Sequence, residues 1–201
     1  MYGFEYGLMF SVPITLVLLL GFGIIGRKQR YPIPYYVFVI VGIIYINYMI
    51  SYAFFPIDFM EIPEYSIYNN IDTHIDFVKA NKVHLLLNVI LTVPLGIVMQ
   101  FITNMKNLSR LLLVFTLSIS IEILQLLILV VFKPIDVYFD IMDLICNGIG
   151  GIVGLGLIAL VNFRYKNALY QNNNTILGYM INVCKNCANN NSSLIMLKTE
   201  M

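Results

Sequence analysis

The sequence has little charge. Only 11% of its 201 residues are Asp, Glu, Lys or Arg, whereas 59% are hydrophobic, and the mean hydropathy is +0.82. Soluble domains carry about 25% charged and about 45–50% apolar residues. The chain therefore lacks half of the charges that a water-exposed surface needs, which excludes an ordinary soluble or disordered protein. The formal net charge of +1 provides no basic field for nucleic acid. The class that remains is an integral membrane protein.

Cysteine is also scarce. The three cysteines are Cys146, Cys184 and Cys187, which do not suggest a disulfide framework. The last two form a single Cys-x-x-Cys that has neither a second cysteine pair nor a histidine partner, so it is a weak basis for a zinc site. We therefore predict neither a metal nor a cofactor.

Long hydrophobic runs are what the chain has instead. The hydrocarbon core of a bilayer is about 30 Å thick and a helix rises about 1.5 Å per residue, so a transmembrane helix needs about 20 mostly apolar residues. Five stretches are long enough, at about 4–26, 35–55, 84–103, 111–132 and 139–163. The predicted fold class is an all-α polytopic membrane protein with about five transmembrane helices.

Lysine and arginine set the expected orientation, because cytoplasmic loops carry an excess of them. Nine of the twelve basic residues fall in the links after the first and third spans and in the C-terminal tail, and three fall in the links after the second and fourth. This bias predicts that the N-terminus lies outside and the C-terminus in the cytoplasm. Five spans also put the two ends on opposite sides, so the count and the bias agree.

The segments outside the spans include one long link and a tail. The link, residues 56–83, is the one substantial extracytoplasmic loop of this topology, and residues 71–79 within it fit an amphipathic helix at the membrane interface. A simple connector with an acidic face is the other interpretation. The tail, residues 164–201, is rich in asparagine and low in charge, so we predict a weakly structured cytoplasmic appendage.

Three of the spans carry polar residues on one face. An ionisable side chain inside a span costs roughly 2.5–3.5 kcal/mol on insertion scales and usually faces protein or water. The polar sets, with members three or four residues apart, are Ser118, Glu122 and Gln125; Asp140, Asp143 and Asn147; and His84, Asn88, Thr92 and Gly96. Such spacing places each set on one helix face, so we expect the three faces to meet.

The predicted topology puts these polar groups in the outer half of the bilayer. From the helical rise, Asn88 and Asp143 lie about 6 Å deep, Gln125 about 10 Å, Asn147 about 12 Å and Glu122 about 15 Å. We predict an outward-facing polar cleft with the ligand-binding residues Asn88, Glu122, Gln125, Asp140, Asp143 and Asn147. The alternative is that Glu122 only holds the bundle together through bonds to Gln125 and Asn147.

Small residues in the third and fifth spans point to close helix packing. Gly150 and Gly154 form a GxxxG pattern, which lets helix backbones approach where lipid supplies no hydrophobic drive. We assign Gly151 and Gly96 the same packing role. Pro94 removes one backbone hydrogen bond from the third span and is predicted to kink it beside the polar face.

The three polar helices also resemble a known family. The segments NVILTVPLG (88–96), SISIEILQ (118–125) and DIMDLICNGIGG (140–151) are similar, in this order, to the signature helices of the VanZ-like family, and the resemblance covers about residues 35–160. It implies a VanZ-like transmembrane domain over residues 1–163 in a bacterial plasma membrane, and a link to low-level resistance against teicoplanin-type glycopeptides. The residues of this chain that match positions of the family's motifs are Asn88, Pro94, Gly96, Glu122, Gln125, Asp143, Asn147 and Gly151. Members often carry an arginine just before the acidic pair, where this chain has Val137.

Three functions fit these features. The first is a non-enzymatic protein whose cleft engages a cell-wall lipid precursor or a lipoglycopeptide. The second is an intramembrane hydrolase or transferase acting on an isoprenoid or phospholipid head group, with Glu122 as acid or base and a divalent ion on Asp140 and Asp143. The third is a small transporter, which five spans without an evident repeat support little. We favour the first. The expected partner is the lipid bilayer, and we expect no binding of nucleic acid.

Overall fold

The computed structural model of the chain describes residues 3–54, 70–76, 81–133, 137–169 and 171–190. The regular structure of this part of the chain is helical apart from two very short strands, in agreement with the predicted all-α class. The elements in chain order are α1 (Gly3–Gln29), α2 (Ile33–Phe54), β1 (Ile71–Asp72), α3 (Lys82–Ile102), α4 (Asn107–Phe132), β2 (Phe139–Asp140), α5 (Ile141–Tyr165) and α6 (Ile176–Asn190).

Four of the described helices, α2, α3, α4 and α5, are long and apolar enough to cross a membrane. Their bounds lie within a few residues of the predicted spans. The first predicted span is also a helix, α1, which is 27 residues long and exposes Val17, Leu20 and Ile24. The protein is thus a multi-pass membrane protein, while the crossing by α1 and the orientation remain predictions.

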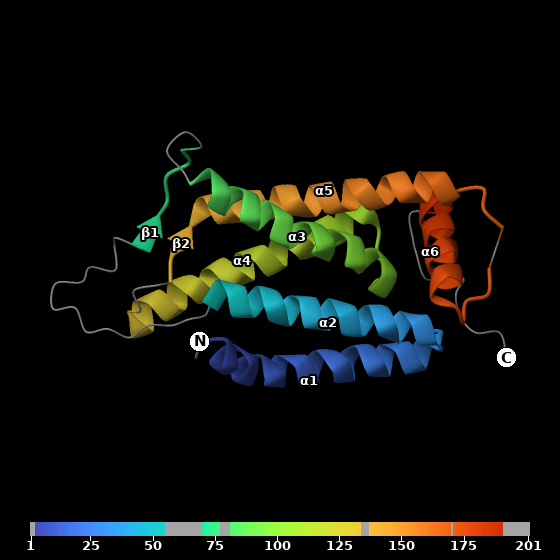
Figure 1. Ribbon diagram of the computed structural model, residues 1–201, viewed down its shortest axis with the longest axis horizontal. Coiled ribbons are helices and arrows are strands. Elements are labelled where there is room, and N and C mark those ends of the chain that lie inside the picture. Colours follow the sequence, from blue (N-terminus) through green and yellow to red (C-terminus); the bar gives the residue numbers. More distant parts are fainter. Residues whose placement is uncertain (1–2, 55–69, 77–80, 134–136, 170, 191–201) are drawn as a thin grey trace.

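Helices α1 to α5 run along the length of the molecule, and α6 lies across one end of them (Figure 1). The closest helix pair is α3 and α5, and α5 also packs against α4, while α1 packs against α2. The outer faces expose large apolar side chains, such as Val131 at 65%, Leu160 at 70% and Phe163 at 78%. Such a surface is stable against lipid rather than water.

The contact between α3 and α5 depends on missing side chains. A Cβ atom added at Gly150 would lie 2.0 Å from Thr92 Oγ1 and 2.2 Å from the carbonyl oxygen of Val89. A Cβ atom at Gly154 would lie 2.3 Å from the carbonyl oxygen of Val93. Both glycines of the GxxxG pattern therefore lie directly against the backbone of α3.

The remaining small residues singled out in the sequence lie around the same crossing. A Cβ atom at Gly96 of α3 would lie 2.8 Å from the carbonyl oxygen of Gly151 and 3.3 Å from Cα of Gly154. Gly151 also faces α4, where an added Cβ atom would lie 2.7 Å from Val114 Cγ1. Pro94 lies inside α3, between the residues that contact α5.

Local sequence determines where α3 and α5 begin. Asn81 caps α3, because its side-chain oxygen accepts hydrogen bonds from the backbone N–H groups of Val83 and His84. Asp140 caps α5 in the same way, with Oδ1 accepting from the backbone N–H of Met142 at 2.7 Å. Asn and Asp are among the preferred residues at this position. Both caps lie at the end of the bundle that carries β1 and β2 (Figure 1).

Part of the long link is held against this end of the bundle. Strands β1 and β2 pair in parallel, with Ile71 opposite Phe139 and Asp72 opposite Asp140. Of the two interpretations of residues 71–79, the amphipathic helix is therefore wrong for residues 71–76, where the strand is followed by residues without regular structure. Residues 77–79 lie outside the described part. The physical reason is that β2 provides backbone partners for β1, and the backbone N–H of His74 bonds Asp72 Oδ1 at 2.8 Å. Residues 56–69 of the link also lie outside the described residues.

The expectation of a weakly structured tail is wrong for residues 176–190, which form α6. This helix buries Tyr179 and Val183 completely, and the hydroxyl of Tyr179 donates a 2.6 Å hydrogen bond to the carbonyl oxygen of Phe101. Asn182 bonds the backbone of Gln171 in both directions, through Oδ1 at 2.9 Å and Nδ2 at 2.7 Å. Asn182 therefore connects α6 to the segment that precedes it, so this part of the tail is structured.

Candidate functional site

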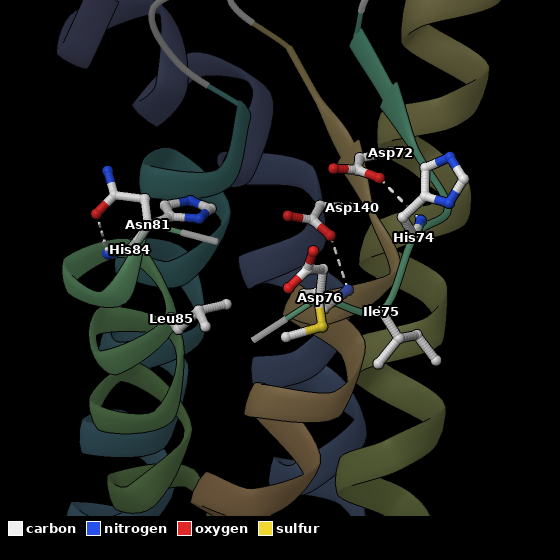
Figure 2. Close-up of a pocket in the computed structure, with 9 residues that line it drawn as sticks. Asp72, His74, Ile75, Asp76, Asn81, His84, Leu85 and Asp140 are labelled. Atoms are coloured by element: carbon white, nitrogen blue, oxygen red, sulfur yellow. Dashed lines mark hydrogen bonds between the residues drawn. The ribbon is translucent and has the colours of Figure 1, made fainter. Parts of the chain in front are cut away.

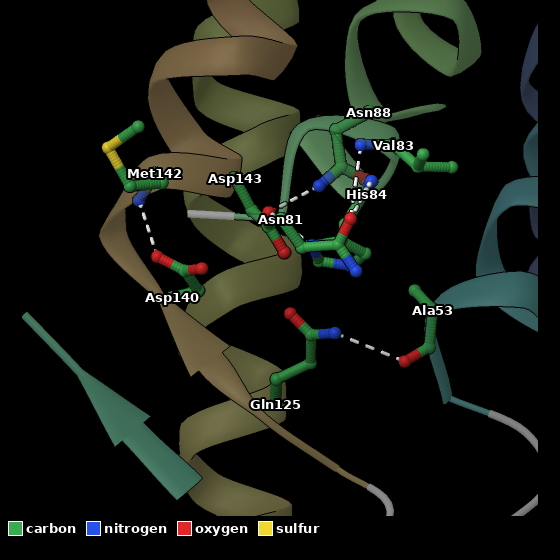
Figure 3. A network of polar contacts seen from close by, with 9 residues as sticks. All are labelled: Ala53, Asn81, Val83, His84, Asn88, Gln125, Asp140, Met142 and Asp143. Atoms are coloured by element: carbon green, nitrogen blue, oxygen red, sulfur yellow. Dashed lines mark hydrogen bonds and ion pairs between the residues drawn. The ribbon is translucent and has the colours of Figure 1, made fainter. Parts of the chain in front are cut away.

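Asp143, in the first turn of α5, receives two side chains from α3 (Figure 3). Asn88 Nδ2 donates a hydrogen bond to Asp143 Oδ1, and His84 Nδ1 lies 3.4 Å from the same oxygen. The second contact is an ion pair when His84 is protonated. The side chain of His84 is 45% exposed and that of Asp143 is 13% exposed, so the pair lies at the edge of the buried interior.

Helix α4 adds two buried side chains with unused oxygen atoms. Gln125 Nε2 donates a 3.1 Å hydrogen bond to the carbonyl oxygen of Ala53 at the end of α2, whereas Gln125 Oε1 has no partner among the described residues. The backbone N–H of Asp140 donates a hydrogen bond to the Glu122 carboxyl group, whose Oε2 has no partner in the same part of the chain. A buried polar atom without a partner costs about 1–3 kcal/mol. These two oxygens are therefore places where a ligand group or an ion would be stabilised.

Asn147 lies one turn beyond Asp143 on α5 and is 7% exposed. Within the described residues its side chain makes no hydrogen bond, and neither Asn147 nor Gln125 bonds Glu122. The structure therefore joins Asn88 to Asp143 and Glu122 to Asp140. The alternative bonding scheme, in which Glu122 is held by Gln125 and Asn147, is not formed there.

A pocket of about 700 Å³ adjoins this network at the β1–β2 end of the bundle (Figure 2). The residues that line it are Asp72, His74, Ile75, Asp76, Asn81, His84, Leu85, Asp140 and Met142. Of the six predicted ligand-binding residues, Asp140 is the one that lines it. The other five are only 4–9% exposed and form a buried polar layer next to the pocket. The hollow thus lies at the mouth of the bundle, whereas the predicted cleft extends to the middle of the membrane.

Of the groups at this mouth, the sequence predicted Asp140 as a ligand-binding residue and placed His84 only on a polar helix face. His84 is four residues before Asn88 on the same helix face, and that spacing is a signal from which its contact with Asp143 could have been predicted. Asp72 and His74 had no such signal, because their place depends on the pairing of β1 with β2, which are far apart in the sequence.

Three side chains at the mouth are close enough to share one metal ion. One ligand atom from each of His84, Asp140 and Asp143 lies within 4.8 Å of the other two. They come from the first turn of α3 and from the start of α5. Imidazole nitrogen together with carboxylate oxygen is a donor set that divalent transition metals accept.

The two cysteines of the Cys-x-x-Cys lie at the opposite end of the bundle, in α6. Both are buried, and Arg110 Nη1 donates a 3.2 Å hydrogen bond to Cys187 Sγ, while Gln100 Nε2 lies 3.8 Å from Cys184 Sγ. Burial, with a smaller contribution from the neighbouring Cys187, raises the pKa of Cys184 to about 12. Cys184 is therefore a neutral thiol rather than a reactive thiolate, and both cysteines lie in the contact between α6 and the bundle.

Apolar spans and a polar mouth between the first turns of two of them define a multi-pass membrane protein with a pocket at one end. The particular family is given by comparison with known sequences: the chain belongs to the family described as VanZ/LLP1, whose model matches residues 33–162. The match confirms the VanZ-like resemblance and ends before α6. No curated protein and no solved structure matches the chain.

Proposed function

We propose that this VanZ-family protein binds a lipid-linked component of the bacterial cell envelope, or a glycopeptide, through the pocket at the β1–β2 end. The observation that carries the proposal is the pocket itself, whose volume of about 700 Å³ is that of a small-molecule site. Its carboxylates, imidazoles and amide suit hydroxyl, amine and amide groups of a ligand. The lipid tails of such a ligand would stay in the bilayer, next to the apolar outer faces of the bundle.

The predicted orientation supports the same proposal. With the N-terminus outside, the pocket opens toward the outer surface of a bacterial plasma membrane, where lipid-linked cell-wall precursors and glycopeptides meet. The family resemblance adds low-level resistance against teicoplanin-type glycopeptides as the biological outcome. Asn88, Glu122, Gln125, Asp143 and Asn147 would then support the pocket from below, because they are buried rather than exposed to it.

Binding can be tested with the purified full chain in lipid nanodiscs. We expect saturable binding of a fluorescent lipid-linked cell-wall precursor or a fluorescent teicoplanin-type glycopeptide. Asp140→Asn should weaken that binding by about 10- to 150-fold, because it removes a charge-assisted contact of about 1.5–3 kcal/mol, while Asn still caps α5. Lys166→Gln, an exposed charge change at the α6 end, is the control and should bind normally. No saturable binding of either probe, or equal affinity for both variants, would reject the pocket as the binding site.

A second candidate function is favoured by one observation, the buried Glu122 with an unpaired Oε2 next to Asp140. It is an intramembrane hydrolase or transferase in which Glu122 acts as acid or base on a lipid head group. The same nanodiscs, supplied with radiolabelled phospholipid and isoprenoid phosphate, distinguish the two. Product formation that disappears in Glu122→Gln would replace the binding function by an enzymatic one.

A further inference from the structure

We infer that His84, Asp140 and Asp143 form a binding site for one divalent transition-metal ion such as Zn²⁺. The three side chains converge from two helices at the mouth of the bundle, and their ligand atoms lie within 4.8 Å of one another. His84 and Asp140 also line the pocket, so an ion held there would face it (Figure 2).

The spacing of one pair of these donors fits a tetrahedral ion. His84 Nδ1 and Asp143 Oδ1 are 3.4 Å apart. Two ligands that each lie about 2.1 Å from a tetrahedral Zn²⁺ are separated by about 3.4 Å, so the ion can fit between these atoms without moving them apart. Three protein donors leave a further coordination position for a ligand or water, as in zinc sites that react with or bind other molecules.

Both carboxylates are already oriented by the fold. Asn88 Nδ2 holds Asp143 Oδ1, and the backbone N–H of Met142 holds Asp140 Oδ1, which leaves the second oxygen of Asp140 for an ion. Such outer hydrogen bonds are what fixes the ligands in metal sites. His84 lies in the first turn of α3, directly after the cap at Asn81, so its backbone is also fixed.

An independent observation points to a missing partner at the same place. Gln125 is 9% exposed, and its Oε1 has no hydrogen-bond partner among the described residues. Figure 3 shows this oxygen directed toward Asp143, whereas the amide nitrogen points the other way and bonds Ala53. An amide oxygen is a metal ligand or accepts a hydrogen bond from metal-bound water, so a cation with its water supplies the partner that Gln125 lacks.

The donor chemistry selects the kind of ion. Imidazole suits Zn²⁺ and other first-row transition metals, whereas Ca²⁺ and Mg²⁺ prefer oxygen ligands alone. The two carboxylates of the site, Asp140 and Asp143, favour a divalent cation. The N-termini of α3 and α5 oppose this by their dipoles, but each such end is equivalent to only about half a positive charge.

A cation at this position would extend the proposed function. The role of the cation in ligand binding rests on that proposed function. Carboxylates repel a phosphate group, but a metal ion with an open coordination position binds one. The ion would therefore let an acidic pocket accept the phosphate of a lipid head group. Metal binding itself does not depend on that role and can be measured without any lipid ligand.

The two histidines of the chain provide a matched pair for the test. His84 belongs to the inferred site, whereas His74 lines the same pocket without belonging to it. We expect the purified full chain in detergent to bind one Zn²⁺ per chain by isothermal titration calorimetry. His84→Gln should lower the affinity by at least about 10-fold, and His74→Gln should leave it unchanged. Co²⁺ should show the intense visible absorption of a four- or five-coordinate site in the unmodified chain and in His74→Gln only.

Folding is controlled by circular dichroism and gel filtration, and Asp140→Asn provides a second variant that keeps the cap of α5. It should lower Zn²⁺ affinity as His84→Gln does. Absence of saturable Zn²⁺ binding, or unchanged affinity in both His84→Gln and Asp140→Asn, would overturn the site. Loss of binding in His74→Gln would overturn it as well, because the ion would then lie elsewhere in the pocket. If Zn²⁺ binds as expected while the lipid-linked precursor and the glycopeptide do not, the proposed function fails and the metal site stands.

Discussion

Glu122 is the residue whose substitution separates a hydrogen-bonding role from a charge role. Its carboxyl group accepts a hydrogen bond from the backbone N–H of Asp140, and its second oxygen has no partner in the described part of the chain. Gln keeps an oxygen that can accept the same bond and removes a carboxylate next to Asp143. Leu keeps the approximate volume and removes the acceptor.

We therefore expect Glu122→Gln to keep the free energy of unfolding within about 0.5 kcal/mol of the unmodified protein. Glu122→Leu should lower it by about 1–3 kcal/mol, because the N–H of Asp140 loses its partner. Unfolding by sodium dodecyl sulfate in mixed micelles, followed by circular dichroism, measures both changes. Equal stability of the two variants would show that the bond to Asp140 does not contribute to folding.

At the residue scale, helical spacing predicted which polar side chains share a face but not which of them bond. Asn88 and Asp143 lie on facing stripes, and the structure joins them directly. Gln125 instead bonds Ala53, because α2 ends where its last carbonyl groups need partners. The partner of Gln125 depends on where α2 ends relative to α4. The spacing of residues within one helix carries no information about that position.

Among the elements, the crossing of α3 and α5 gives the sharpest stability prediction. Gly150→Ala should destabilise the bundle by about 1–3 kcal/mol, because the added Cβ atom would lie 2.2 Å from the backbone oxygen of Val89 and the helices must move apart. Gly156, on the same helix, has no atom within 4 Å of such a Cβ. Gly156→Ala is therefore the control and should be neutral or stabilise α5 by up to about 1 kcal/mol.

The same unfolding assay in mixed micelles compares the two alanine variants. A loss of stability in both would mean that α5 needs flexible glycines rather than close contact with α3. Unchanged stability in Gly150→Ala would mean that the backbones of α3 and α5 do not meet at this position.

The sequence was informative about the long helices and misleading about the short elements. The length of the hydrophobic runs predicted the bounds of α2 to α5 within a few residues. A segment in lipid must satisfy its own backbone hydrogen bonds, so a long apolar run has few alternatives to a helix. Helix α6 was not predicted, since asparagine-rich composition suggests disorder until its partners are known. Its fully buried Tyr179 and Val183 find those partners on the bundle, and β1 finds its partner in β2. Both are long-range contacts that local patterns do not contain.

The molecule as a whole has two different ends. Strands β1 and β2, the pocket and the start of α1 lie at one end, and α6 lies at the other (Figure 1). The helix order places Arg27, Lys28, Lys106 and Arg164 at the α6 end, which agrees with a cytoplasmic position for that end. The pocket would then open outside, so the orientation decides whether extracellular ligands can reach it.

Cysteine labelling in intact cells tests this orientation with residues that the structure shows to be accessible. Ile75 is 59% exposed near the pocket, and Leu169 is 80% exposed near α6. In a variant without the native cysteines, we expect a membrane-impermeant maleimide to modify Ile75→Cys in intact cells and Leu169→Cys only after permeabilisation. The reverse pattern would place the pocket in the cytoplasm and would exclude extracellular ligands. An N-terminal epitope tag tests whether α1 crosses the membrane. Because α2 begins at the α6 end, which is predicted to be cytoplasmic, an antibody can reach the tag in intact cells only if α1 crosses to the outside.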